Sequence, residues 1–574
     1  MSGKIYPKKI NGKTYYYLQT TYREKINPDD VGKTRGSGKS KVKTKTIYLG
    51  TAETIKRKLS TIKEPIEIKH KELGLVGAAF TTAQEIGLID ILKNNIQGKR
   101  YGIENWKYFL LAIINRIDHA TSKEKMGAWA SKTILPELLD FDATRLNSKS
   151  FWYATDDVVS EKELNDRREE DPAIEEEIMT GIEDAILRQM EKELVRNIAK
   201  EYELSSDVFL YDTTNFFTFF KEPLRSQLAK AAKSKAGRNN LKHVGLALCV
   251  DKQWGIPLFH SVYRANSHDT KTFHEIIDEL ITVMKSEISV NQMILIIDKG
   301  NNSKTNFEKI DNEIELIGSL KISDHQDLID INLDDYTGTY KEFKYYATEK
   351  KVMGLDMKLV LTYNDKLYRK QQNSLNAGIK KLKKQLEIKW DQYKLPLKRV
   401  PKGIKTILSD SRYKNYLSVR CKKGQPVFIE RTENINAKKK SFGKSLLFSS
   451  KTNTLSQSII ELYHSKDKIE DGIKLLKDPH LISWQPMRHW TDTKIRAFAF
   501  CSIMALVLIR IMEYKVTINN LKMSPQVLKQ ELQDLKQVIL IYDEKTARIK
   551  LTHRSTVQKK LWDVFRLGNL KYGA

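Results

Sequence analysis

The stretch Met293-Ile-Leu-Ile-Ile-Asp298-Lys-Gly-Asn301 decides the fold. An apolar run without alternation is typical of a central strand that is covered on both faces of a sheet. Upstream, Val208-Phe-Leu-Tyr211 is a second apolar run, and Asp212-Thr-Thr-Asn follows it directly. Each run therefore predicts a buried strand with an aspartate at its tip.

Two more strands and a helix are predicted between these runs, at Val244–Val250, Ile256–Tyr263 and Thr270–Lys285. The order is then β, β, β, α, β. Ligands of open α/β sheets bind at strand ends, and two aspartates on neighbouring buried strands repel each other unless a cation lies between them. Asp212 and Asp298 are therefore candidate ligands of a divalent cation. The alternative is that each is a turn residue or a helix N-cap.

The charge of the chain is unevenly distributed. Of 574 residues, 99 are Lys or Arg and 72 are Asp or Glu, which gives a formal net charge of +27. Residues 1–63 hold 16 Lys and Arg and 4 Asp and Glu (net +12), and residues 366–423 hold 18 and 3 (net +15). Two basic segments on a neutral body indicate a polyanionic partner; a solvated lysine-rich surface is the alternative. The 40 % apolar content excludes global disorder.

Several classes of protein are not expected. Cys249, Cys421 and Cys501 are far apart and form no cluster with histidines, so neither a disulfide framework nor a zinc module is indicated. The N-terminal residues contain no apolar stretch typical of a signal peptide. The run Ala497–Ile509 is shorter than the roughly 20 residues that cross a bilayer, so it predicts a buried helix. We expect a cytoplasmic protein without a membrane partner.

The regions outside these strands differ in composition and in predicted secondary structure. Residues 1–75 are expected to form a small basic β-rich region, because residues 13–22 and 43–49 are rich in β-branched and aromatic residues. Its tyrosines either pack within the sheet or stack on a nucleic acid. Residues 76–203 predict helices at Ala83–Ile96, Glu104–Ile117 and Ala173–Tyr202. A basic helix is expected at Leu367–Lys389, strands at 415–432 and 445–449, and a polar helix at 524–539.

A third candidate element lies near the C-terminal end. Tyr463, Lys466, Glu470 and Lys477 share one side of a predicted helix, because a helix turns by about 100° per residue. A carboxylate flanked by cations and a phenol suits metal and phosphate binding together. The alternative is an exposed helix with an ion pair between Lys466 and Glu470.

The sequence resembles bacterial insertion-sequence transposases of the DDE type, in the branch marked by a Y-(2)-R-(3)-E-(6)-K signature. This chain has Y-(2)-K-(3)-E-(6)-K from Tyr463 to Lys477, and Asp298-Lys-Gly where the branch has Asp-Arg-Gly. Arg264–Phe273 is similar to the segment Gly-Asn-x-x-Asp-x-x-Thr-Phe of that group, and Pro486–Asp492 is similar to its ending. The likeness covers nearly the whole chain in the right order.

The resemblance implies an α/β protein with a ribonuclease H-like core, a mixed sheet with flanking helices. This core would occupy residues 204–320 and 456–515 and be interrupted by an α+β insertion domain at 321–455. A small basic β-sheet (1–75) and a helical DNA-binding or dimerisation region (76–203) would precede it, and a C-terminal helical region (516–574) would follow.

The resemblance also implies a function. The protein would be a DNA transposase that binds the inverted-repeat ends of an insertion sequence, cleaves them and joins their 3′ ends to target DNA, as a homodimer. Its implied catalytic residues and ligands of two Mg²⁺ or Mn²⁺ ions are Asp212, Asp298 and Glu470. Its implied DNA contacts are Tyr463, Lys466, Lys477 and Lys299.

Trp390, in the basic insertion, is the candidate for holding a flipped base; a core tryptophan is the alternative. Two other functions remain open: a ribonuclease H-like DNA nuclease without strand transfer, and a non-catalytic DNA-binding protein derived from a transposase.

Overall fold

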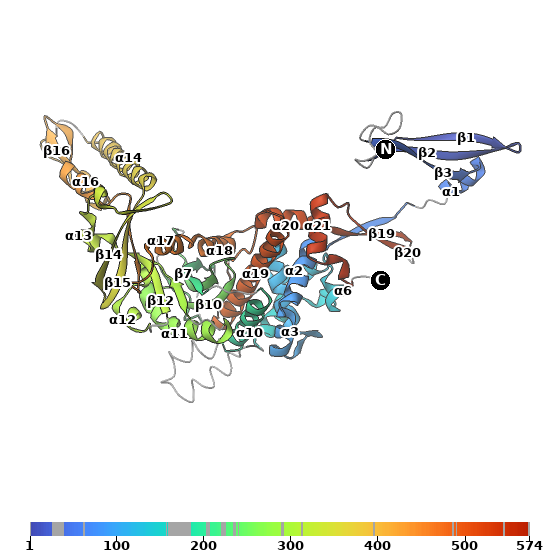
Figure 1. Cartoon of the computed structure of the whole chain (residues 1–574), viewed down its shortest axis with the longest axis horizontal. Helices are drawn as coiled ribbons and strands as arrows, with labels where there is room; N and C mark the ends of the chain where they lie inside the picture. Colours follow the sequence, from blue (N-terminus) through green and yellow to red (C-terminus); the bar gives the residue numbers. More distant parts are fainter. Residues whose placement is uncertain are drawn as a thin grey trace. The chain divides into compact units, whose positions relative to one another are not determined.

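The computed structural model forms two units, Met1–Lys71 with Lys536–His553 and Glu72–Leu535 with Arg554–Ala574 (Figure 1). The described residues are 2–25, 40–60, 64–156, 158, 185–202, 207–219, 226–232, 237–238, 240–288, 292–310, 314–393, 397–484, 487–489, 491–543 and 546–571. The first part of the predicted helix Ala173–Tyr202 and part of the segment Pro486–Asp492 lie outside them.

The first unit begins with a three-stranded antiparallel sheet, as the sequence predicts. It consists of β1 (Ser2–Ile10), β2 (Lys13–Lys25) and β3 (Ser40–Gly50), followed by α1 (Ala52–Ser60). Asn11 and Gly12 join β1 to β2, both with positive φ, which matches the twist of a two-residue hairpin. Tyr17 pairs with Tyr6 on one side and Tyr48 on the other, at ring-centroid distances of 5.8 and 5.3 Å. The tyrosines thus pack on one another within the sheet, and Tyr48 remains 56 % exposed.

A second small sheet in this unit corrects the expected C-terminal helical region. The predicted helix 524–539 ends at Gln533, as α20 (Pro525–Gln533), and β19 (Lys536–Asp543) and β20 (Thr546–Leu551) form an antiparallel hairpin. β19 also neighbours β4 (Glu67–Glu72) in this sheet. The run Val538–Ile541, rich in β-branched residues, favours a strand once partner strands are present. Its partners are β20, which follows it directly, and β4, which lies far away in sequence. Only α21 (Thr556–Val564) adds a later helix of the expected kind.

The second unit is built on a ten-stranded mixed sheet in the order β10-β9-β7-β11-β12-β18-β15-β14-β13, with β8 (Lys230–Ala231) beside β9. Its first part follows the predicted order: β7 (Val208–Phe217), β9 (Lys242–Asp251), β10 (Pro257–Arg264), α11 (Asp269–Ile288), β11 (Met293–Ile296) and β12 (Ile314–Leu320). β10, β9 and β7 are antiparallel, and β7, β11 and β12 are parallel. This mixed arrangement is compatible with a ribonuclease H-like core.

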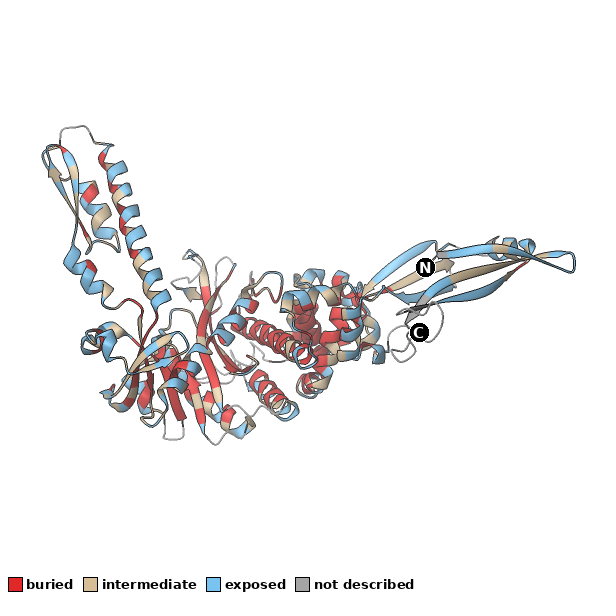
Figure 2. Ribbon diagram, turned by 45° about the horizontal axis from the view of Figure 1, so that its top comes forward, coloured by how far each residue is buried: buried red, intermediate tan, exposed pale blue. Residues whose placement is uncertain are grey.

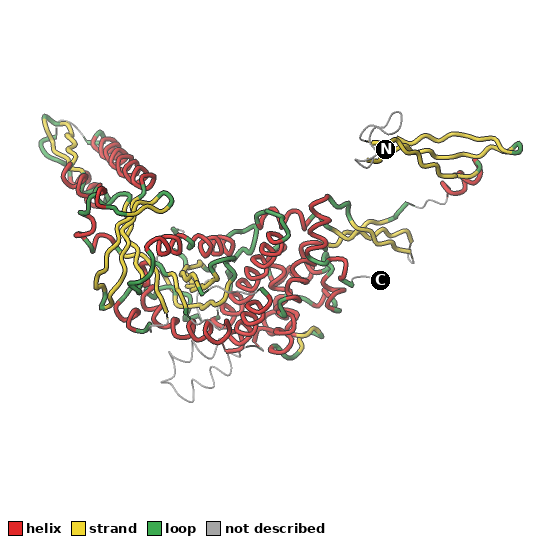
Figure 3. Tube along the Cα trace, viewed as in Figure 1, coloured by secondary structure: helices red, strands yellow, loops and turns green. Residues whose placement is uncertain are grey.

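The strands of the insertion continue the same sheet, which corrects the expectation of a separate insertion domain at 321–455. β18 (Lys444–Ser449) pairs with β12 and with β15 (Leu355–Tyr363), and β14 (Phe343–Val352) and β13 (Gly338–Tyr340) follow (Figure 3). The remaining insertion elements pack around a small core of their own. They are α14 (Asp365–Trp390), α15 (Lys402–Asp410), β16 (Leu417–Lys422), β17 (Gln425–Glu430) and α16 (Thr432–Lys439).

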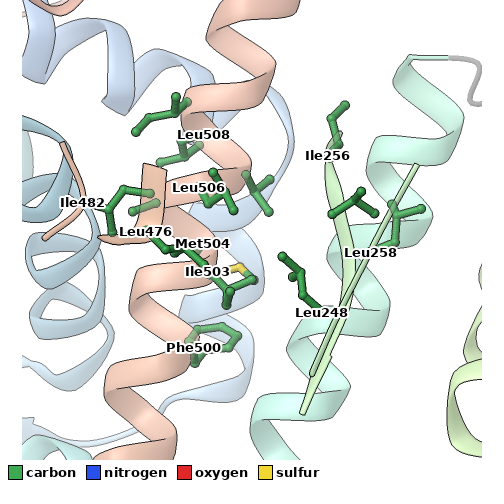
Figure 4. Packing of buried hydrophobic residues seen from close by; sticks show 14 of the residues in the cluster. Leu248, Ile256, Leu258, Leu476, Ile482, Phe500, Ile503, Met504, Leu506 and Leu508 are labelled. Atoms are coloured by element: carbon green, nitrogen blue, oxygen red, sulfur yellow. The ribbon is translucent and has the colours of Figure 1, made fainter. Parts of the chain in front are cut away.

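One long apolar helix, α19 (Asp492–Ile518), organises the rest of the second unit. It packs on β10 and on α2 (Gly74–Glu85), α4 (Asn105–Asp118) and α7 (Ser148–Asp156). Figure 4 shows Leu248 and Leu258 of the sheet facing Ile503 and Leu506 of α19. By length and composition α19 could cross a membrane, but its apolar window is entirely buried in the protein. In Figure 2 the helices at the centre of this unit are largely red, the colour of buried residues. The predicted buried helix is confirmed.

The predicted helices of residues 76–203 join this same core. They correspond to α2, to α3 (Leu88–Asn95), to α4, and to α10 (Ala185–Glu201), which packs on α11. The break between α2 and α3 lies at Gly87, whose φ of 73° lies in the left-handed region that favours glycine. The helical region and the sheet therefore share one continuous hydrophobic core.

Candidate active site

Two aspartates lie at neighbouring positions of the central sheet. β7 and β11 are parallel, and their last pair joins Leu210 to Ile296. Asp212 and Asp298 each lie two residues beyond that pair, and the backbone at Asp298 is still extended (φ −89°, ψ 157°). Residues in register on neighbouring strands are about 5 Å apart and point to the same face. The sheet therefore brings together the two carboxylates that the sequence predicted.

The face of the sheet on which Asp212 lies is defined by its neighbours on β7. Tyr211 packs edge-on against Phe273 of α11, and Thr213 donates a hydrogen bond to Asp269 at the start of α11 (3.1 Å). Because side chains alternate along a strand, Asp212 and Thr214 lie on the opposite face. Helix α18 (Asp467–Lys477) packs against β7.

Lys477, in the last turn of α18, fixes that helix on the sheet. Its Nζ donates a hydrogen bond to Thr214 Oγ1 (2.7 Å) and lies 5.3 Å from the ring centroid of Phe216. Thr214 and Phe216 are two and four residues beyond Asp212 on the same face of β7. Lys477 therefore lies on the Asp212 side of the sheet.

Lys466, at the start of α18, contacts the second aspartate. Its Nζ lies 3.3 Å from Oδ1 of Asp298 and 5.5 Å from the ring centroid of Tyr463. The Lys466 side chain is 11 % exposed, whereas that of Asp298 is 44 % exposed. An enclosed ammonium group thus neutralises a carboxylate that remains open to solvent.

Glu470 lies between these two contacts along α18. It is one turn after Lys466 and two turns before Lys477, about 6 Å and about 10 Å along the helix axis. Glu470 and Lys477 point in directions within about 20° of each other around the helix, and Glu470 is exposed. Glu470 therefore lies between Lys466, which contacts Asp298, and Lys477, which contacts Thr214 on the strand of Asp212. In the described part of the chain, no three side chains of His, Cys, Asp or Glu form a group that could hold a metal ion.

The helix predicted across Tyr463–Lys477 is interrupted, which corrects the sequence-based expectation of one shared face. Tyr463 belongs to α17 (Ser456–His464), and Lys466 is the N-cap of α18. The amide of Lys466 bonds to the carbonyl of Tyr463 and that of Lys468 to Ser465, three residues back rather than four. Such tight turns rotate the chain by more than 100° per residue. The hydroxyl of Tyr463 is hydrogen-bonded to Ser319 Oγ at the end of β12 (2.9 Å).

Asp269 is a site residue that the sequence did not single out. Its carboxylate accepts the hydrogen bond of Thr213, and it lies so close to Gly300 that a Cβ there would be 2.9 Å from Asp269 Oδ2. Asp269 therefore joins the Asp212 strand to the loop after Asp298. The only sequence signal is its place in the segment Arg264–Phe273, directly before the helix after the third strand.

These acidic groups give the edge of the sheet a negative potential. Burial raises the pKa of Tyr263, and the charges of Asp269 and Asp212 raise it further. Burial also raises the pKa of Tyr211 well above its ordinary value, with contributions from Tyr263 and both aspartates. A negative potential at strand ends favours the binding of a cation.

The remaining candidates, Lys299 and Trp390, lie in different surroundings. Lys299 is exposed and directly follows Asp298. Trp390 is fully buried in the core of the insertion elements, and its Nε1 donates to the carbonyl of Gly424 (3.3 Å). It offers no surface to a flipped base, so the core-tryptophan alternative describes it correctly.

Comparisons with solved structures give weak likenesses. No protein-family model matches the chain, and no curated protein matches it. The cryo-EM structure of the piggyBac transposase synaptic complex with hairpin DNA is similar over 83 % of this chain and 81 % of that chain, with 8 % identity and a TM-score of 0.39. A TM-score this low does not establish a shared fold.

Proposed function

We propose that this protein is a DDE-type DNA transposase with a ribonuclease H-like core, whose catalytic carboxylates are Asp212, Asp298 and Glu470. One observation carries the proposal: the register of β7 and β11 aligns the two aspartates, and α18 lies over them with Glu470 between its contacts to Asp298 and Thr214. These contacts of β7, β11 and α18, which are far apart in sequence, support the proposal, and the sheet order β10-β9-β7-β11-β12 supports the same core.

The donor chemistry of Asp212, Asp298 and Glu470 suits divalent cations, although the three carboxylates do not form a metal-binding group in the described part of this structure. All three groups supply carboxylate oxygens, which are the ligands that Mg²⁺ and Mn²⁺ prefer. The ammonium of Lys466 on Asp298 indicates that this position favours a positive charge. Asp212, Asp298 and Glu470 would hold two Mg²⁺ or Mn²⁺ ions, which when bound would stabilise the charge that develops on the phosphate.

The other residues would position DNA. Lys466, Lys477 and the exposed Lys299 form a cationic border around the carboxylates, and each can donate to phosphate oxygens as a point charge. Water would attack the phosphorus at an element end, and the bond to the 3′ oxygen would break, leaving a 3′-hydroxyl and a 5′-phosphate. That hydroxyl would then attack a phosphate of the target DNA and displace its 3′ oxygen.

Two basic surfaces would supply affinity for the inverted-repeat ends through counterion release. One is the sheet β1–β3, where Lys4, Lys8 and the exposed Tyr48 lie on the same face as Tyr17. The other is α14, whose Lys380, Lys381 and Lys384 are exposed. A homodimer that pairs two ends, in the cytoplasm of a bacterium, completes the proposal.

The decisive experiment measures cleavage of a duplex carrying the inverted repeats that flank the gene. Asp212→Asn, Asp298→Asn and Glu470→Gln should each reduce Mg²⁺-dependent cleavage by at least about a thousandfold, while end binding stays within about twofold of the unmodified protein. Asp471→Asn is the matched control, because Asp471 neighbours Glu470 on α18 and pairs only with Lys474 among the described residues. Any of the three variants that still cuts with Mg²⁺ refutes the assignment.

The same assay separates the alternatives. A transposase joins the cleaved 3′ ends to a supercoiled plasmid, whereas a nuclease without strand transfer leaves the plasmid unchanged. A non-catalytic DNA-binding protein binds the ends but cuts nothing at any Mg²⁺ or Mn²⁺ concentration.

A further inference from the structure

Two adjoining cavities lie in the second unit between α4, α7 and α19, away from the carboxylates. One has a volume of about 230 Å³ and the other about 630 Å³. They share the lining residues Arg116, Lys123, Arg488, His489 and Phe498. Ligand pockets for small molecules span roughly 300–1,000 Å³, so the pair is large enough for a ligand with two distinct parts.

Three cations converge where the cavities meet. Arg116 of α4 donates to the carbonyl of Ser483 (2.6 Å) and stacks on Phe498, with its guanidinium 4.4 Å from the ring centroid. Lys123 lies 4.8 Å from the ring centroid of Phe151, and Arg488 is exposed at the opening. Among the described residues, no carboxylate forms an ion pair with any of the three.

A fourth cation on the wall is different because its charge is already balanced. Lys494 contacts Asp156 and donates to Thr155 Oγ1 (2.8 Å) and to the carbonyl of Trp152 (2.6 Å). Lys494 therefore has no need of a further anion, and the free positive charge is that of Arg116, Lys123 and Arg488.

Burial and mutual repulsion lower the pKa values of the groups in this cluster. Burial and the charge of Arg116 together lower the pKa of Lys123 to about 8. Burial lowers the pKa of Arg116 to about 10. Burial and the charges of Lys123, Arg116 and Lys494 lower the pKa of His489 to about 3, so this ring is neutral at pH 7. An anion bound in the cavity would offset the free-energy cost of burying these positive charges.

The smaller cavity is also lined by aromatic side chains. Tyr108, Phe109, Phe151, Trp152 and Phe498 line it, from three different helices. Flat rings of this kind offer stacking surfaces to planar ligands.

We propose that the paired cavities bind a nucleotide, with its phosphate on Arg116, Lys123 and Arg488 and its base against the aromatic wall beside Trp152. This chemistry has two sources, a free mononucleotide or a nucleotide at the end of a DNA strand, and both present a phosphate joined to a planar base. The inference does not rest on the proposed transposase activity, because none of the carboxylates Asp212, Asp298 or Glu470 lines either cavity.

The test is calorimetric titration of the full-length protein with dAMP, deoxyadenosine, inorganic phosphate, and a ten-nucleotide single strand with a 5′-phosphate. Lys123→Gln and Trp152→Ala should each weaken nucleotide binding at least about tenfold. Lys149→Gln is the matched control, since Lys149 is exposed on α7 and lines neither cavity. Trp152→Phe keeps a flat ring, so this variant should bind dAMP with an affinity within about twofold of that of the unmodified protein.

The outcomes are distinct. Saturable binding of dAMP that depends on Lys123 identifies a free nucleotide as ligand, and Lys123-dependent binding of the strand alone identifies a strand end; both support the proposal. Equal affinity for inorganic phosphate and dAMP, or binding that Lys123→Gln and Trp152→Ala leave unchanged, overturns it. Asp298→Asn should leave dAMP affinity unchanged, so a failed cleavage assay and a failed nucleotide titration are separate results.

Discussion

The ammonium group of Lys466 lies 3.3 Å from Oδ1 of Asp298. The lysine is the more enclosed partner, so its charge is held in place by the turn between α17 and α18 and by the ring of Tyr463. The carboxylate, by contrast, is open to solvent. This pair balances the charge of Asp298 itself while leaving its carboxylate accessible to a competing cation.

Removing the charge of Lys466 should raise the affinity of the site for Mn²⁺ and lower the rate of DNA cleavage. Lys466→Gln leaves Asp298 without its neutralising charge, so affinity for Mn²⁺, measured by calorimetry, should rise about threefold or more. Cleavage of an end duplex should fall at least about tenfold, because one phosphate contact is lost. Lys466→Arg should restore cleavage, since a guanidinium supplies the same charge. Unchanged Mn²⁺ affinity in Lys466→Gln would show that the pair does not compete with a metal.

The contact of Lys477 with Thr214 should stabilise the docking of α18. Hydrogen bonds that involve a charged group contribute about 1.5–3 kcal/mol, so Lys477→Ala should lower the free energy of unfolding in urea by about 1–3 kcal/mol. Lys474→Ala is the control on the same helix, because Lys474 is exposed and pairs with Asp471 at the surface. It should cost no more than about 0.5 kcal/mol. Equal costs for the two variants would contradict a docking role.

A buried ion cluster joins α10 to β10 and α11. Glu191 accepts from His260 Nδ1 (2.5 Å) and contacts Arg188, which also donates to Glu279 (2.8 Å). Burial alone would raise the pKa of Glu191, but the charges of His260 and Arg188 outweigh it and lower this pKa. Glu191→Gln removes the carboxylate that accepts from His260 and one of the two carboxylates that contact Arg188, and it should lower stability by about 3–5 kcal/mol.

The sign of the pH dependence follows from that lowered pKa. The unfolded value is about 4.3, so the contribution of Glu191 is fully present above that pH and is lost as pH falls through the folded pKa. The stability difference between the unmodified protein and Glu191→Gln, measured in urea from pH 3 to 7, should therefore be constant above about pH 5 and shrink below about pH 4. Glu201→Gln, at the exposed end of α10, should show neither effect. A difference that stays constant down to pH 3 would contradict this account.

Nucleotide binding at the paired cavities should weaken in alkaline solution. Lys123 faces Arg116 and Cys501 there, and its pKa of about 8 means that it binds an anion fully only below that pH. Affinity for dAMP should begin to fall between pH 7 and 8, to about half at pH 8, and then fall by up to tenfold per unit to pH 9.5. His489 stays neutral over this range, and the phosphate is already fully ionised. Lys123→Arg should give a flat profile; a decline as steep as that of the unmodified protein would exclude Lys123 as its cause.

Much of the sheet could be predicted because its signal is local. The apolar runs at Val208 and Met293 predicted strands covered on both faces, and β7 and β11 are buried at most of their positions. The aspartates that follow these runs were candidates for the same reason. Asp269 was missed because its function depends on reaching Thr213 and Gly300, which no local pattern reveals.

Other features depended on partners distant in sequence. The run Val538–Ile541 could extend a helix or form a strand, and pairing within the first unit made it β19. The helix across Tyr463–Lys477 was predicted as continuous, whereas the contacts of Tyr463 with Ser319 and of Lys466 with Asp298 accompany a turn between two helices. For Trp390, sequence offered two environments, and only packing selected the core.

The sequence by itself determined which residues carry charge and which segments must be buried, because hydrophobic patterning and net charge are properties of the chain alone. It thereby specified the strands, the long buried helix α19, the basic segments and the carboxylates. The tertiary structure decided which of these groups meet. Parallel pairing of β7 with β11 aligns Asp212 with Asp298, and α18 brings Glu470 over them, because register and helix docking are fixed by contacts between residues more than eighty positions apart.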